Sequence, residues 1–299
     1  MVSSVVTRVA ERAPIVLVVA SMCMYASGAA FAKSLFDEAS PTTVVWLRLA
    51  IGAVILAALA RPRLGGRSTT DWQVVVGFGV SLAVMNWSYY EAIQRIPLGL
   101  AVLFESTGPL AVALLGSRRP RDLLWVALAA VGIVLLSFEP GQLSWAGVLF
   151  ALLAGAAWGA YILLSQSTGG RWEGWDGLAV ASVVAAVIVT PFALAGDVSA
   201  VGHAHVAGIG VVVALLGTVI PYSFELAALR TVPSNVFGVL MSLEPGIAAL
   251  IGLIGLGETL GAVQWLALLC VIAASVGATR SNPRPSPRSG SDELPVVAS

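Results

Sequence analysis

The sequence predicts an all-α integral membrane protein with ten transmembrane helices, arranged as two inverted repeats of five helices each. Three observations support this fold class. Hydrophobic residues make up 58% of the 299 positions and charged residues 11%, which is about half the charged share of a soluble domain. The apolar residues form long continuous runs, as in helices that cross a bilayer. Two distant segments also resemble each other, and each carries a carboxylate within an apolar run.

The apolar runs are separated by short connections that contain Pro, Gly or Arg. About 20 helical residues are enough to cross the hydrocarbon core. The first five predicted helices cover residues 14–34, 42–60, 72–93, 97–116 and 122–138, and the second five cover 144–165, 175–194, 205–227, 234–256 and 261–279. We therefore expect a cytoplasmic segment at 1–13, repeats at 14–139 and 143–279, and a disordered cytoplasmic tail rich in Ser, Pro and Arg at 280–299.

The internal repeat is clearest in two segments, which run from Pro97 to Pro109 and from Pro233 to Pro245. The prolines coincide when the segments are aligned, and each segment holds a Glu close to its second proline. A charge in the middle of a membrane helix costs roughly 2.5–3.5 kcal/mol on insertion scales, and Pro removes a helical hydrogen bond. A chain that carries these costs at matching places in two halves is typical of a transporter whose site lies between the repeats.

The distribution of arginine predicts the orientation. If the N-terminus is cytoplasmic, nearly all arginines of the connections lie inside, and the outer side keeps only Lys33 and Arg95 as basic residues. A repeat with an odd number of helices ends on the side opposite to its start. The second repeat would therefore enter the membrane upside down, and both termini would be cytoplasmic.

Several short motifs follow one another through nearly the whole chain. They are Leu47-Arg48-Leu49, Met85-Asn86, Thr107-Gly108-Pro109-Leu110, Pro221-Tyr222-Ser223, Met241-Ser242-Leu243-Glu244-Pro245 and Leu256-Gly257-Glu258. With these motifs the chain resembles the drug/metabolite transporter superfamily with EamA-type repeats. Within it, the likeness is greatest to bacterial inner-membrane exporters of threonine and homoserine. Glu91 departs from that pattern, which has a neutral residue there.

The resemblance implies a secondary transporter in the bacterial plasma membrane that exports small amino acids by proton antiport with alternating access. Its partners would be a small-molecule substrate, protons and the bilayer, with no nucleic acid and with a homodimer left open. Two alternatives also stay open, an exporter of another metabolite or drug and, more distantly, a membrane-embedded enzyme. The sequence contains no nucleotide-binding loop, so a gradient must supply the energy.

Charged residues inside the predicted helices are the first candidates for the site. Arg48 and Glu105 lie at similar depth in helices that run the same way, so they can form an ion pair. In the functional interpretation, Arg48 binds the substrate carboxylate and Glu105 binds its ammonium or a proton. Glu244 is a candidate for proton coupling, because burial disfavours the charged form of a carboxylate. A structural ion pair and a protonated, hydrogen-bonded Glu are the alternative explanations.

Further candidates are polar or aromatic. Glu225 lies near the inner end of the eighth helix, and Lys33 lies near an outer end, where it can also pair or snorkel. Polar and aromatic side chains that can line a pocket or join helices are Asn86, Tyr90, Trp158 and Tyr161. We expect Pro109 and Pro245 to kink their helices. The separated cysteines, Cys23 and Cys270, and the single pair of histidines in one loop predict no disulfide, metal site or cofactor.

Overall fold

The computed structural model of the protein describes residues 14–115, 122–136, 144–173, 175–196, 198–221, 224 and 240–281. Glu225, Pro233 and both chain ends lie outside these residues. The helices of the first half are α2 (Pro14–Lys33), α3 (Pro41–Ala60), α4 (Thr69–Arg95), α5 (Leu98–Glu105), α6 (Thr107–Leu115) and α7 (Asp122–Leu136). Those of the second half are α8 (Trp145–Gly169), α9 (Asp176–Ala195), α10 (Ala204–Ala214), α13 (Glu244–Leu256) and α14 (Ala262–Ser281).

Four of the described helical segments are long and apolar enough to cross a membrane. They are Ile15–Lys33, Pro41–Ala60, Trp145–Gly169 and Asp176–Ala195. Shorter apolar stretches occupy Leu98–Val112, Ala204–Val219, Glu244–Leu256 and Ala262–Gly277. Large apolar side chains such as Leu59 and Ile254 point outward, where they are 71% and 81% exposed. An outward apolar surface of this kind suits contact with lipid rather than with water.

Local sequence sets the two ends of α3. Ser40 caps the N-terminus by accepting a hydrogen bond from the Thr43 N–H, and Pro41 occupies the first turn. At the other end Arg61 takes a left-handed conformation with φ of 49°, and its N–H bonds the carbonyl of Ala57. This conformation closes the helix as a C-cap and is usually taken by Gly.

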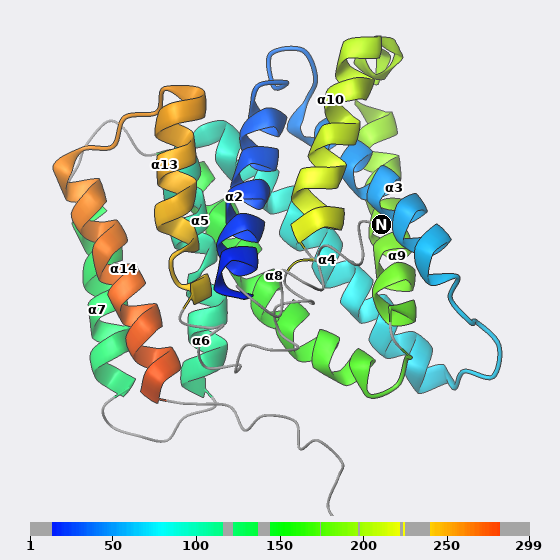
Figure 1. Cartoon of the computed structure of the whole chain (residues 1–299), viewed down its shortest axis with the longest axis horizontal. Helices are drawn as coiled ribbons and strands as arrows, with labels where there is room; N and C mark the ends of the chain where they lie inside the picture. The colour runs from blue at the N-terminus through cyan, green and yellow to red at the C-terminus, as the bar shows by residue number, and fades with distance from the viewer. Residues whose placement is uncertain are drawn as a thin grey trace, which may run out of the picture.

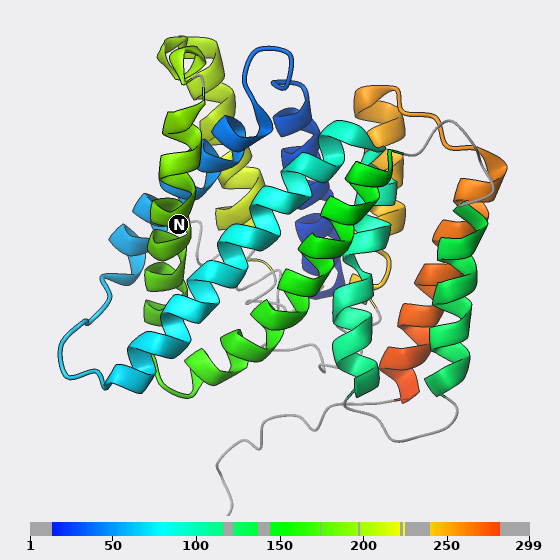
Figure 2. The same ribbon diagram turned by 180° about the vertical axis from the view of Figure 1, so that it is seen from behind.

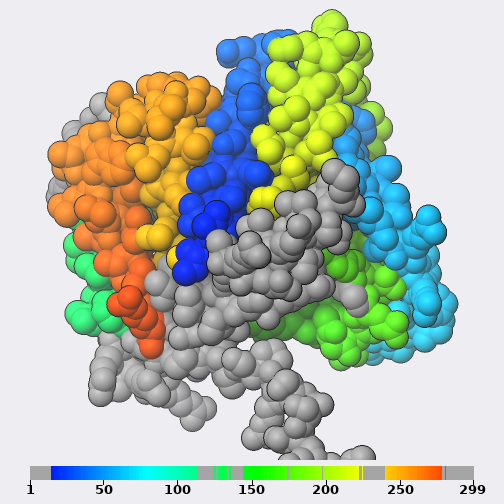
Figure 3. All heavy atoms as spheres, in the orientation of Figure 1, coloured from blue at the N-terminus to red at the C-terminus, as the bar shows by residue number. Residues whose placement is uncertain are grey.

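The two halves interlock instead of packing as separate bodies (Figures 1 and 2). Helix α4 packs along α8 and α9, α3 packs on α9 and α10, and α7 pairs with α14 at one edge. Helix α2 lies between α13 and α10, as the space-filling view also shows (Figure 3). Equivalent helices of the two halves make equivalent contacts. Helix α2 packs on α13 as α8 packs on α5 and α6, and α3 packs on α10 as α9 packs on α4. One apolar core therefore spans both halves.

The fourth apolar run is divided into α5, which ends at Glu105, and α6, which begins at Thr107. Pro109 explains the division, because it has no N–H to bond the carbonyl of Glu105. Gly155 of α8 lies against that carbonyl, and a Cβ placed on it would be 2.6 Å from the Glu105 oxygen. The break therefore lies at a close crossing of α5–α6 with α8.

Candidate functional site

Arg48 lies in the centre of the bundle and is only 2% exposed. Its Nη2 donates to the carbonyl of Gly217 at 2.5 Å and its Nε donates to Thr218 Oγ1 at 3.2 Å. The guanidinium lies 5.3 Å from the ring centre of Tyr25 and 5.7 Å from that of Tyr90, at cation–π distance. With the Tyr90 hydroxyl, which accepts from Nη1 at 3.5 Å, one carbonyl, two hydroxyls and two aromatic rings surround this cation.

The partners of Arg48 lie on a π-helical turn, η2 (Leu215–Val219), that continues α10. A single π turn inside an α-helix is rare and is often found at functional sites, because it interrupts the regular hydrogen-bond ladder. Here the turn presents the Gly217 carbonyl to Arg48 from the second half of the chain. Arg48 of α3, in the first half, therefore donates hydrogen bonds to two residues of η2, in the second half.

Two buried carboxylates accompany Arg48. Glu105, at the end of α5, is 4% exposed and Glu244, at the start of α13, is 7% exposed. Glu105 interacts through its charge with both Glu244 and Arg48. The charge of Arg48 acts on Glu105, and the direct ion pair considered from the sequence stays a prediction. The site therefore combines one cation and two carboxylates from three helices.

Two buried polar atoms near this cluster have no hydrogen-bond partner in the part of the chain that the structure describes. They are Asn86 Oδ1 and the Tyr89 hydroxyl. The Asn86 amide nitrogen is used, because it donates to the carbonyl of Leu82 at 2.8 Å. Arg48, Asn86 and Thr218 also line a cavity of about 10 Å³, roughly enough for one water. Buried polar atoms rarely stay unpaired, so these two can bond water or a ligand.

One end of the bundle is tied by Lys33. Its Nζ lies 2.5 Å from Glu258 Oε1 and also donates to the carbonyl of Ile96 at 3.0 Å. The other carboxylate oxygen of Glu258 accepts the N–H of Leu98, the first residue of α5, at 2.7 Å. Glu91 forms an ion pair with Arg95 at 2.6 Å in the last turn of α4. Lys33 therefore joins the end of α2 to the end of α4 and to Glu258, and Glu258 in turn bonds the start of α5.

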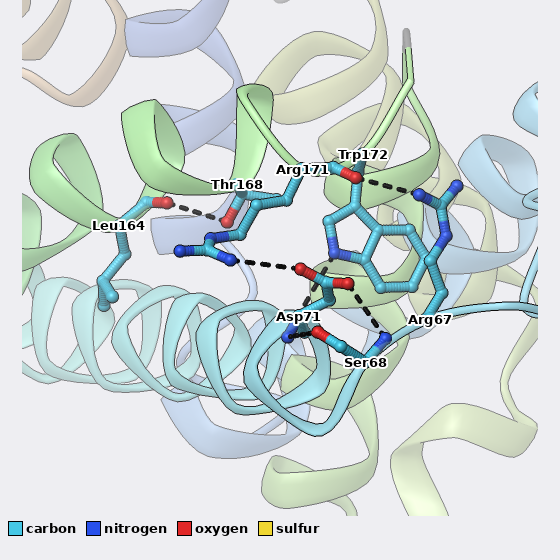
Figure 4. Close-up of polar contacts among 7 residues, drawn as sticks. All are labelled: Arg67, Ser68, Asp71, Leu164, Thr168, Arg171 and Trp172. Atoms are coloured by element: carbon cyan, nitrogen blue, oxygen red, sulfur yellow. Dashed lines mark hydrogen bonds and ion pairs between the residues drawn. The ribbon is translucent and has the colours of Figure 1, made fainter.

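The opposite end carries a polar cluster between the α3–α4 and α8–α9 connections (Figure 4). Asp71 forms a capping box with Ser68 and an ion pair with Arg171 at 3.2 Å. Arg67 lies over the ring of Trp172, 4.5 Å from its centre, and donates to the carbonyl of Arg171. The hydrogen bonds from Ser68 hold the pKa of Asp71 below its ordinary value, with help from the Arg171 charge.

The structure therefore brings together Arg48, Asn86, Tyr90, Glu105 and Glu244 from the set chosen by sequence. The other candidates lie apart: Tyr161 packs on Phe78 at 5.0 Å, Trp158 packs against the apolar core, and Lys33 lies at one end. The sequence reasoning missed Tyr25 and the Gly217–Thr218 pair. A lone Thr in an apolar run was a weak signal, and a backbone carbonyl gives none. No group of three or more metal-ligating side chains occurs among the described residues.

A buried charged cluster between two interlocked, helical halves is the arrangement of a membrane transporter, and the comparisons with known proteins agree. The EamA-like transporter family matches residues 12–138 and 145–280. The chain belongs to this family, which makes it a membrane protein with two EamA repeats. The resemblance to EamA-type transporters that was predicted from the motifs is confirmed.

Among individual proteins, the chain is similar to the threonine/homoserine exporter RhtA. It is 42% identical to the protein of Salmonella typhimurium and 43% identical to that of Escherichia coli K12, over 89% of this chain and 91% of each relative. It is also 28% identical to the uncharacterized transporter YwfM of Bacillus subtilis, over 78% of this chain and 82% of that protein. A solved crystal structure that is 17% identical shares the fold, with a TM-score of 0.64 over 91% of this chain and 98% of the other.

Proposed function

We propose that the protein exports threonine, homoserine and similar small amino acids across the bacterial inner membrane in exchange for protons. The similarity to RhtA exporters over 89% of the chain supports this substrate class. The observation that carries the proposal is the buried group of Arg48, Glu105 and Glu244, which lies between the two halves. Its charges match those of a zwitterionic amino acid.

Each polar part of such a substrate has a complementary group here. The guanidinium of Arg48 binds a carboxylate through parallel, charge-assisted hydrogen bonds. The substrate ammonium can donate hydrogen bonds to the ionised carboxylate of Glu105 and to Asn86 Oδ1. Both groups act only as acceptors. The substrate hydroxyl of threonine or homoserine can bond the Tyr89 hydroxyl, which has no hydrogen-bond partner among the described residues.

The two carboxylates also support the proton coupling. One guanidinium balances one carboxylate, which leaves a second negative charge in a poorly hydrated interior, where an unbalanced charge is costly. A proton or the substrate ammonium removes that cost equally well. Because the two cations compete for the same carboxylates, the binding of one favours release of the other, and this competition is the basis of antiport.

We propose ten transmembrane helices in two inverted repeats, at 14–139 and 143–279, with both termini in the cytoplasm. The matched helix pairings support a pseudo-two-fold relation between the halves. So do the helix breaks, which fall at Ser106 in the first half and at Ser242–Leu243 in the second, at aligned positions. The segments 1–13 and 280–299 would then both be cytoplasmic.

The test is efflux of labelled threonine and homoserine from proteoliposomes, with a pH gradient imposed and then collapsed. We expect gradient-dependent efflux by the wild type and its loss in Glu244→Gln and Glu105→Gln. Glu38→Gln is the matched control, because Glu38 is a half-exposed carboxylate in a connection. If the folded wild type moves neither amino acid, the substrate is another metabolite. If Glu244→Gln and Glu105→Gln both stay gradient-dependent, neither carboxylate couples the proton.

A further inference from the structure

A cavity lies at the C-terminal end of α3, away from the Lys33–Glu258 ion pair. It measures about 560 Å³, which falls within the usual size of small-molecule sites. We call it the α3 vestibule, and its lining residues are Leu56, Leu59, Ala60, Arg61, Arg63, Glu173, Trp175, Asp176 and Val219. They come from the end of α3, the α8–α9 connection, the start of α9 and η2. Like the central cluster, the vestibule lies between the two halves of the chain.

The vestibule is lined by two arginines and two carboxylates that do not neutralise each other. Within the described residues, neither Arg61 nor Arg63 forms an ion pair with Glu173 or Asp176. Asp176 is tied instead to the backbone, because its Oδ2 accepts the N–H of Arg63 at 3.1 Å. Because this bond uses only the backbone N–H of Arg63, the Arg63 guanidinium is available to bind a ligand. A net-neutral wall of separated opposite charges is complementary to a zwitterion, which presents a carboxylate and an ammonium together.

The backbone at Arg61 is a second observation. It is the one non-glycine residue among those described that takes a positive φ. Such conformations cost free energy and tend to persist at functional sites, where the surrounding structure maintains them. The left-handed cap ends α3 at the wall of the vestibule, and the Arg61 side chain contributes to its lining.

The vestibule is connected to the central cluster by two elements. Along α3, Arg48, Gly52 and Leu56 recur every four residues and so share one face of the helix. Leu56 lines the vestibule, and Gly52 and Arg48 line the small central cavity. Along η2, Val219 lines the vestibule, and its neighbour Thr218 bonds Arg48. Leu56 is 2% exposed, and one helical turn separates it from Gly52 of the central cavity.

We propose that the α3 vestibule is a recruitment site for zwitterionic amino acids, where substrate is collected before it moves along α3 to Arg48. Arg61 and Arg63 receive the carboxylate, and Glu173 and Asp176 receive the ammonium. This inference rests on the proposed function and adds a second, shallower site to it. Since the site only collects substrate, its loss weakens apparent affinity and leaves the maximal rate of transport almost unchanged.

Efflux kinetics over a range of internal threonine or homoserine concentrations test the proposal. In Arg61→Gln and Glu173→Gln, we expect the half-saturating concentration to rise about three- to fivefold, as for loss of a partly exposed charged contact, with a maximal rate within about twofold of wild type. Arg61→Lys, which keeps the charge, should recover most of the affinity. Arg280→Gln removes an exposed arginine at the end of α14, outside the vestibule, and should behave like wild type.

The outcomes separate this inference from the proposed function. If wild type transports and both Arg61→Gln and Glu173→Gln keep the wild-type half-saturating concentration, the vestibule does not recruit substrate. If the maximal rate falls instead, or if Arg280→Gln raises the half-saturating concentration equally, the charges act on structure or insertion and the proposal is wrong. If wild type moves neither amino acid, the proposed function has failed first. Glu173 is exposed, so its variant folds readily and keeps the test decisive.

Discussion

Lys33 Nζ lies 2.5 Å from Glu258 Oε1, which joins the end of α2 in the first half to the segment after α13 in the second. The α2–α3 and α13–α14 connections share one end of the bundle, and the α3–α4 and α8–α9 connections share the other (Figures 1 and 2). The Lys33–Glu258 ion pair therefore lies at the end opposite the α3 vestibule. Under the proposed exchange mechanism, an ion pair between the halves at one end and a cavity at the other would suit a state that is open at the vestibule.

The Lys33–Glu258 pair should contribute measurably to the stability of this state. Its side chains are 21% and 14% exposed, so solvent screens their attraction only in part. In a double-mutant cycle with Lys33→Met and Glu258→Gln, we expect a coupling free energy of about 1–2 kcal/mol, measured by chemical unfolding in detergent. The exposed His205–Glu38 pair, 3.7 Å apart, is the control and should show almost none. Equal coupling in both pairs would contradict a structural role for the tie.

The crossing of α6 with α8 has no room for a side chain at Gly108. A Cβ placed there would overlap the carbonyl group of Gly155, and overpacking of this kind costs about 1–3 kcal/mol or more. Gly108→Ala should therefore lower the melting temperature. Gly208 of α10 has nothing within 4 Å of a built Cβ, so Gly208→Ala should instead stabilise the helix slightly, by up to about 1 kcal/mol. If Gly108→Ala leaves the melting temperature unchanged, the two helices can move apart at little cost in free energy.

Hydropathy predicted most of the fold because lipid imposes it directly on the sequence. The runs at 42–60 and 175–194 fall on α3 (Pro41–Ala60) and α9 (Asp176–Ala195), since helix length in a bilayer is set by its thickness. The buried charges were found for the same reason, because a charge inside an apolar run stands out. Arg48, Glu105 and Glu244 were chosen in this way.

The contacts that complete the site were not predictable in the same way. Arg48 bonds a backbone carbonyl, that of Gly217, and every residue carries such a group. The carbonyl is available because of a π turn, which depends on packing between helices and has no clear sequence signature. Lys33 and Glu258 were each visible as charges, but pairing across more than two hundred residues follows only from the way in which the halves interlock.

The Asp71 cluster predicts a pH dependence of stability. Hydrogen bonds from Ser68 and the charge of Arg171 lower the pKa of Asp71 below its ordinary 3.8. A carboxylate whose pKa is lower in the folded state stabilises the protein at every pH above its unfolded-state pKa. This contribution is lost as the pH falls through the folded-state pKa. Asp71→Asn should therefore melt below wild type at pH 7, and the difference should shrink as the pH falls below about 4. Asp37→Asn, at an exposed position, should match wild type throughout, and a difference for Asp71→Asn that persists at low pH would contradict this account.

Arg48 should be sensitive to geometry as well as to charge. A Lys keeps the charge, but its single ammonium cannot bond Gly217, Thr218 and a substrate carboxylate with the planar fork of a guanidinium. We expect Arg48→Lys to reduce efflux by about tenfold to a hundredfold, the effect of losing a charged hydrogen bond. Thr218→Val removes only one acceptor at nearly constant volume and should reduce efflux far less. Melting temperatures measured on the same proteoliposome preparations would show that both variants are folded. If Arg48→Lys transports like wild type, Arg48 only joins the two halves, and another cation must receive the substrate carboxylate.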